Sequence, residues 1–198
     1  MRFFYTLIVI CVLADPAYCQ QNDAMNYVIG REQIIIKGRT NINKFECKLD
    51  LNEMMDTLQV SVTQFNGNFD FSGLTLNIPV DAFDCKHSIM TSEFRELLRS
   101  NEYPNLSLSI SNIEHLVPNK LRMLTELSVA DSKNEELISE CYVQNLGHEL
   151  VLGGDHQIYL RSYNLEPPKK LFGAVVVKNE LNISFEVTLF GKIEKEPQ

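Results

Sequence analysis

The chain has 198 residues, the length of one ordinary domain. Hydrophobic residues make up 44% of it and charged residues 22%, which is typical of a globular protein and argues against a disordered or membrane-embedded chain. The formal net charge of −8 argues against a nucleic-acid-binding protein, because contacts with a phosphate backbone require a basic surface.

The N-terminus has the pattern of a secretory signal peptide. Arg2 supplies a positive charge, and the apolar run Phe3–Ala14 that follows is too short to span a bilayer. Small residues near Cys19 predict cleavage after that residue, so residues 1–19 form the signal peptide and 20–198 the mature domain. The mature chain is therefore expected to be secreted or periplasmic, with no stable membrane span. A lipoprotein acylated at Cys19, which the bulk of Tyr18 disfavours, and a retained anchor are the alternatives.

Three cysteines would remain after export: Cys47, Cys85 and Cys141. In an oxidising compartment two of them are expected to form a disulfide, which leaves one thiol over. Cys141 alternates with Leu137 and Val143, a pattern typical of a buried thiol that packs as a small hydrophobic side chain. The chain contains no CxxC motif, so a redox-catalytic function has no support in the sequence.

The first strands are predicted at Tyr27–Gly30 and Gln33–Lys37, joined by a turn at Gly30-Arg31. In the segment that follows, Gly38 permits a bulge or a positive φ, and Thr40 can bond to the local backbone through the bend. An ordinary bulge and a contact with a ligand both explain this segment.

From Phe45 onward, apolar residues alternate with polar ones over six runs, and turn residues separate the runs. A period of two with one polar face predicts antiparallel strands, and strands at this spacing predict a sandwich or an up-and-down barrel. The alternating apolar residues are Phe45, Cys47, Leu49, Leu51; Leu58, Val60, Val62; Leu74, Leu76, Ile78, Val80; Leu106, Leu108, Ile110; Leu121, Met123, Leu127, Val129; and Ile183, Phe185, Val187, Leu189.

One short helix interrupts the strands and is predicted from Thr91 to Asn101. Thr91 would be its N-cap, and Phe94, Leu97 and Leu98 form one apolar stripe. Pro104 forces the chain to leave the helix in an extended conformation. Further along, Gly147–Leu165 is predicted to form two short strands on either side of Gly153-Gly154.

Three groups of residues, in the same order along the chain, resemble the YceI-like family of bacterial envelope proteins. The first is a glycine followed by a hydroxyl residue and a phenylalanine, the second surrounds the predicted helix, and the third precedes the last strand. These residues are Gly38, Thr40 and Phe45; Phe83, Asp84, Met90, Phe94, Leu97, Pro104 and Leu106; and Leu165, Pro167, Pro168 and Gly173.

The resemblance implies an all-β fold, an antiparallel up-and-down, lipocalin-like β-barrel with one short α-helix, which binds polyisoprenoid or other long-chain lipids. It covers about 34–190 and also implies that Cys47 pairs with Cys85, since the helical segment lies beside both. Two departures stand out: Leu108 replaces the phenylalanine that many relatives carry, and 134–146 matches no part of the family pattern.

Catalytic motifs are absent from the sequence: it has no nucleophile elbow, HExxH, phosphate-binding loop or dinucleotide fingerprint. His148 and His156 flank the predicted Gly153-Gly154 hairpin, with Glu149 and Asp155 beside them, and two histidines with a carboxylate could bind zinc or iron. Solvated turn residues are the simpler interpretation. We therefore expect no enzyme activity, no catalytic residue and no metal or other cofactor.

The predicted function is to hold one long-chain isoprenoid or similar apolar lipid in the barrel lumen. The alternative is a structural or interaction protein whose barrel is filled by its own side chains. A homodimer is also compatible with the sequence. The residues expected to line the lumen are Leu58, Val60, Val62, Leu74, Leu76, Ile78, Phe94, Leu106, Leu108, Ile110, Met123, Phe185 and Val187.

Overall fold

A computed structural model describes 23–50, 59–65, 68–71, 73–170 and 174–191. Its strands are β1 (Asp23–Arg39), β2 (Lys44–Asp50), β3 (Gln59–Phe65), β4 (Asn68–Asp70), β5 (Thr75–Pro79), β6 (Asn105–Val117), β7 (Lys120–Val129), β8 (Ser132–Asn145), β9 (Glu149–Tyr159), β10 (Lys169–Lys170), β11 (Val175–Val176) and β12 (Glu180–Gly191). The helices are α1 (Ser88–Leu97) and the 3₁₀ turns η1 (Val80–Ala82) and η2 (Leu160–Tyr163). The predicted signal peptide lies outside the described residues.

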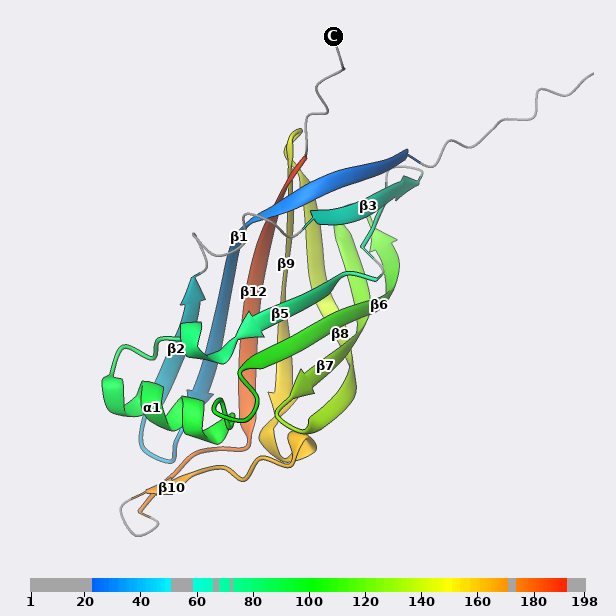
Figure 1. The fold of residues 1–198 in the computed structure, drawn as a ribbon. Coiled ribbons are helices and arrows are strands. Elements are labelled where there is room, and N and C mark those ends of the chain that lie inside the picture. Colours follow the sequence, from blue (N-terminus) through cyan, green and yellow to red (C-terminus); the bar gives the residue numbers. More distant parts are fainter. Residues whose placement is uncertain (1–22, 51–58, 66–67, 72, 171–173, 192–198) are drawn as a thin grey trace, which may run out of the picture.

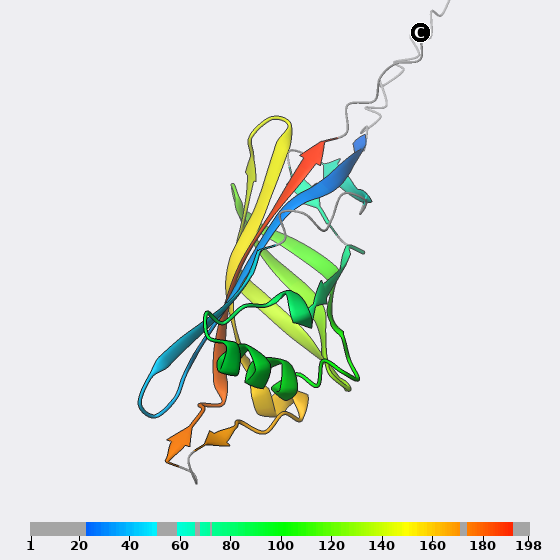
Figure 2. The same ribbon diagram turned by 60° about the vertical axis from the view of Figure 1, so that its left-hand side comes forward.

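Ten of these strands form one antiparallel sheet in the order β4-β3-β1-β12-β9-β8-β7-β6-β5, with β2 also paired to β1. The sheet curls into a half-barrel, and α1 lies across its open side at one end (Figures 1 and 2). From β5 to β9, strands that follow one another in sequence also pair in the sheet. The predicted lipocalin-like, all-β fold with one α-helix is confirmed. The segment 134–146, which matched no part of the family pattern, is essentially β8.

The predicted turn at Gly30-Arg31 is wrong, because β1 continues through it as one strand with a bulge between Ile29 and Arg31. A Cβ atom at Gly30 would lie 2.0 Å from the ring of Phe190, so the glycine makes room for an aromatic side chain of β12. At Gly38 the register between β1 and β2 is regular, and the ring of Phe45 occupies the space a Cβ would need.

The β2 edge of the sheet is fastened to the segment that precedes α1. Lys48 and Asp84 exchange two backbone hydrogen bonds of 2.8 Å, and Cys47 and Cys85 next to them form a disulfide. The disulfide implied by the family resemblance is therefore present. It ties the loop before α1 to the strand, so the helix is held over the open side of the half-barrel.

Helix α1 begins three residues earlier than predicted, at Ser88, and ends at Leu97. The cap residue is His87, and Thr91 instead organises the preceding loop: its hydroxyl accepts a hydrogen bond from the amide of Cys85 at 3.0 Å and lies 3.3 Å from a carboxylate oxygen of Asp84. The prediction that Thr91 is the N-cap is therefore wrong. Its hydroxyl bonds to the amide of Cys85 in the preceding loop and not to an amide of the first helical turn. The apolar stripe is confirmed, with Phe94 and Leu98 buried.

Candidate functional site

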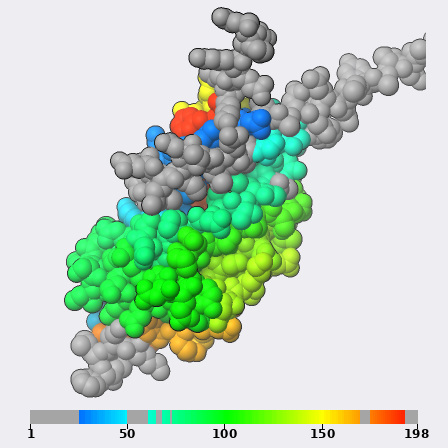
Figure 3. Space-filling model, viewed as in Figure 1, coloured from blue at the N-terminus to red at the C-terminus, as the bar shows by residue number. Residues whose placement is uncertain are grey.

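An apolar cavity lies on the inner face of the sheet beneath α1. Its volume is about 90 Å³. The sheet supplies the walls, while Phe94 of α1 and Leu98, which follows the helix, form part of the roof. In the space-filling view, α1 and its flanking turns (green) cover this end of the molecule (Figure 3).

The predicted lumen residues divide into two groups. Five line the cavity: Ile78, Phe94, Leu106, Leu108 and Phe185. Six are buried in the core without lining it: Val62, Leu74, Leu76, Ile110, Met123 and Val187. Leu58 lies outside the described residues, and of Val60 only the backbone is described. The half of the interior under α1 is therefore hollow, and the half toward β3 and β4 is packed.

Sequence reasoning missed twelve apolar residues of the lining. Two of them, Ile34 and Ile36, alternate within the QIIIK run, which was a usable signal for an inward face. Others come from η2 and the segment after it, whose approach to the sheet no local pattern announces. The twelve are Ile34, Ile36, Phe83, Leu98, Leu127, Val129, Ile138, Ile158, Leu160, Leu165, Leu181 and Ile183.

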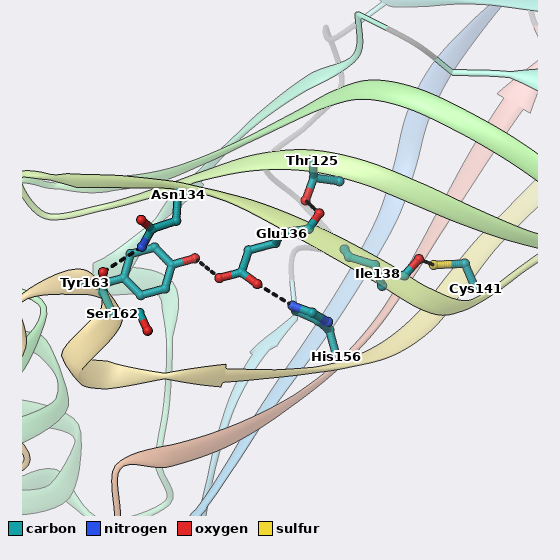
Figure 4. Close-up of polar contacts among 8 residues, drawn as sticks. All are labelled: Thr125, Asn134, Glu136, Ile138, Cys141, His156, Ser162 and Tyr163. Atoms are coloured by element: carbon teal, nitrogen blue, oxygen red, sulfur yellow. Dashed lines mark hydrogen bonds and ion pairs between the residues drawn. The ribbon is translucent and has the colours of Figure 1, made fainter.

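Four polar residues interrupt the apolar wall, and two of them bond to the carboxylate of a third (Figure 4). Tyr163 donates a hydrogen bond of 2.6 Å to Oε1 of Glu136, and Nε2 of His156 lies 2.9 Å from Oε2. The hydroxyl of Thr125 donates to the backbone oxygen of Glu136 at 3.2 Å. Burial, together with the carboxylate of Glu136, raises the pKa of Tyr163 far above its usual range, so the phenol remains a donor.

This polar cluster lies at a seam in the sheet. The backbone ladder between β8 and β9 runs from Asn145 to Glu140, and within the described residues no backbone pair joins the two strands beyond Glu140 and Asp155. Beyond Glu140 and Asp155, side chains connect β8 and β9 to each other and to the segment at η2. Asn134 donates to the backbone oxygen of Ser162 at 2.7 Å, and Asn164 donates to the hydroxyl of Ser132 at 2.9 Å. The wall of the cavity is therefore closed here by side chains.

The predicted hairpin at Gly153-Gly154 is wrong, because β9 runs through both glycines as one strand that pairs with β8 and β12. Eight residues of extended strand, about 26 Å, separate His148 from His156, so the two cannot share a metal ion. Within the described residues no three histidine, cysteine or acidic side chains are grouped to hold a metal. Cys141 is a buried free thiol, and burial is the main cause that raises its pKa to about 12, which suits the predicted packing role. Leu137, however, is exposed rather than on the same face.

A second, larger hollow of about 710 Å³ lies near the β1–β2 hairpin. Charged residues such as Lys37, Arg39, Lys44 and Lys86 line it, together with Glu46 and Glu180. Hydrocarbon gains little from such a surface, so the apolar cavity is the better candidate for an apolar ligand. No helix in the described part of the chain is both long and apolar enough to cross a membrane.

Known structures share the fold, although no family model and no curated protein matches the sequence. BcnA of Burkholderia cenocepacia aligns with a TM-score of 0.64 over 79% of this chain and 95% of its own, at 14% identity. A polyisoprenoid-binding domain from Saccharophagus degradans aligns with a TM-score of 0.61 over 86% of this chain and 100% of its own, at 9% identity. The YceI protein of Campylobacter jejuni aligns with a TM-score of 0.52 over 63% and 75%, at 11% identity.

The chain has the YceI fold. The family resemblance of three separate motifs therefore predicted the correct fold. It did so although the sequence identities to these structures are only 9–14%. In this chain the cavity, α1 and the β8–β9 seam lie together at one end of the half-barrel.

Proposed function

We propose that this protein binds one long apolar lipid, such as an isoprenoid, in the cavity beneath α1. The observation that carries the proposal is the cavity itself, whose wall is apolar apart from the four polar residues of the seam. A hydrocarbon chain placed there gains about 0.8 kcal/mol for each buried methylene, without any catalytic group. The likeness to a domain described as polyisoprenoid-binding supports this class of ligand.

We also propose that the protein acts outside the cytoplasm, in the periplasm or as a secreted protein. The apolar run Phe3–Ala14 behind Arg2 supports export, and the Cys47–Cys85 disulfide suits an oxidising compartment. N-terminal sequencing of the mature protein tests this directly: a start at Gln20 is expected, and a chain that retains Met1 in the cell would contradict it.

Native mass spectrometry of the protein purified from its own host tests the binding function. We expect a species heavier than the polypeptide, and organic extraction should release an apolar lipid that accounts for the added mass. A protein that carries no extra mass and takes up no added isoprenoid would contradict the proposal.

The second candidate is an interaction protein with no ligand, and the packed half of the interior favours it. A matched pair of substitutions separates the two functions. Ile110→Trp introduces a large ring into the packed half and is expected to cost about 2–3 kcal/mol of unfolding free energy. Leu108→Trp, on the same strand but at the cavity, is expected to cost less than about 1 kcal/mol and to abolish lipid uptake.

Chemical denaturation measures both stabilities, and because the native chain has no tryptophan the new indole also reports its surroundings. A carrier predicts blue-shifted emission from the Leu108→Trp variant, together with the loss of binding. Equal destabilisation by both substitutions, with no effect on any bound lipid, would favour the ligand-free function.

A further inference from the structure

The two most exposed large apolar side chains in the described part of the chain lie at one end of the molecule. Ile89, in the first turn of α1, is 74% exposed, and Ile42, at the tip of the β1–β2 hairpin, is 64% exposed. Met90, next to Ile89, and Lys44, two residues after Ile42, line the same charged hollow, so both isoleucines lie beside it. The hairpin projects from the end of the molecule that carries α1 (Figures 1 and 2).

The tip of the hairpin is fixed by bonds that do not involve the side chain of Ile42. The hydroxyl of Thr40 accepts hydrogen bonds from the amides of Ile42 and Asn43 at 3.1 Å and 2.8 Å. The side chain of Asn41 donates to the backbone oxygen of Ala174 at 2.8 Å, which braces the tip against the segment before β11. The fold therefore presents an apolar side chain to solvent on a braced projection, where a polar residue would serve the turn equally well.

The charged hollow beside the isoleucines is basic, although the chain as a whole has a formal net charge of −8. Four lysine and arginine side chains line it, against two glutamates. Glu180 and Glu46 each form an ion pair with one of the four. The other two, Lys37 and Lys44, are exposed and form no ion pair within the described residues. This end of the protein therefore carries uncompensated positive charge.

We propose that the docking surface formed by Ile42, Ile89, Lys37 and Lys44 binds the surface of an anionic phospholipid bilayer. The lysines would attract phosphate headgroups while the isoleucines enter the boundary between headgroups and acyl chains, as in proteins that lie on a membrane without spanning it. A small soluble anion would account for the lysines but not for the isoleucines, which gain only from an apolar phase. The inference goes beyond the proposed lipid binding, and it places a bilayer next to the helix that roofs the cavity.

Sedimentation of the full mature chain with phospholipid vesicles tests the docking surface. We expect binding to vesicles that contain phosphatidylglycerol and much weaker binding to vesicles of phosphatidylcholine alone. Raising the salt from about 0.1 M to about 1 M should weaken the binding, because it shortens the screening length from about 10 Å to about 3 Å. No isoprenoid is added, so the result does not depend on a ligand in the cavity.

A matched pair of double variants tests which residues dock. Ile42→Ser/Lys44→Gln should lower the affinity for the anionic vesicles about tenfold or more, because it removes one inserted side chain and one headgroup contact. Leu146→Ser/Lys120→Gln removes the same charge and a similarly exposed apolar side chain at the opposite end of the molecule (Figure 1). This control should bind as the native protein does, and an equal fall in both variants would overturn the docking surface.

A single tryptophan gives a second readout, because the native chain has none. The emission of Ile42→Trp should shift to the blue when anionic vesicles are added, and that of Leu146→Trp should not. A native protein that binds no anionic vesicles would overturn the proposal. Calorimetry that shows binding of inorganic phosphate without any binding to vesicles would replace it with a small-anion site. The lipid-binding function is tested independently, by native mass spectrometry.

Discussion

Replacing Cys47 and Cys85 together by alanine is expected to lower the free energy of unfolding by about 4 kcal/mol. The disulfide links residues 38 positions apart, and a cross-link over a loop of that length removes about this much conformational entropy, expressed as free energy, from the unfolded chain. It also holds the loop before α1 against β2, so we expect α1 to detach more readily and the cavity to open. Urea denaturation followed by circular dichroism measures the effect.

The control for this prediction is Cys141→Ala, which removes a buried thiol that takes part in no disulfide and should cost only about 1 kcal/mol. A reducing agent should destabilise the native protein to the level of the double variant and leave that variant unaffected. Equal unfolding midpoints for the native and double-variant proteins would show that the cross-link contributes no stability.

The second large effect is a loss of stability between about pH 4 and pH 7, caused by Glu32. This side chain is fully buried on β1, its register partner on β12 is Val187, and both carboxyl oxygens lack a hydrogen-bond partner. Burial raises the pKa of Glu32 to about 7, from an ordinary value near 4.3 in the unfolded chain. The folded state therefore binds the proton more tightly than the unfolded state does.

The sign of the effect follows from that difference. The favourable contribution is complete below about pH 4, decreases as the pH rises, and is lost above the folded-state pKa, with a total change of about 4 kcal/mol. The glutamine of the Glu32→Gln variant cannot ionise. Between pH 4.5 and pH 8.5, the unfolding free energy of the native protein should therefore fall by about 3 kcal/mol more than that of the variant. Denaturant titrations at several pH values measure both slopes.

Glu140→Gln provides the comparison, since it removes an exposed carboxyl on β8 and should leave the native pH profile nearly unchanged. Parallel pH profiles for the native protein and Glu32→Gln would show that Glu32 is hydrated or paired in solution. A successful result would identify a buried polar group on β1, two residues from Ile34 of the cavity lining.

Much of the fold could be predicted from local patterns. Alternation along Leu106, Leu108 and Ile110 indicated an antiparallel strand with one buried face, and Phe94 and Leu98 indicated a helix packed on a sheet. Two of the errors occurred at glycines: Gly30 and Gly153-Gly154 were interpreted as turns, whereas they lie within strands and make room for the side chains of Phe190, Tyr142 and Phe185. A glycine that accommodates a distant ring cannot be told from a turn glycine by its sequence neighbours.

The candidate site was less predictable than the fold. Five of the predicted lining residues lie on the cavity, but alternation could not separate them from Ile110 or Met123, which face inward in the packed half. Glu136, His156 and Tyr163 come from β8, β9 and η2, and no spacing relates them. They meet because the backbone ladder between β8 and β9 ends at Glu140, and side-chain hydrogen bonds join the elements beyond it.

The sequence by itself therefore determined the class of fold, the position of the single helix to within a few residues, and which faces of most strands turn inward. These properties depend on interactions between residues close together in the chain, where periodicity and capping residues act. Only the tertiary structure decided where the interior is hollow and which polar groups line it. Both depend on how far strands distant in sequence separate, and on which side chains fill the space that the separation leaves.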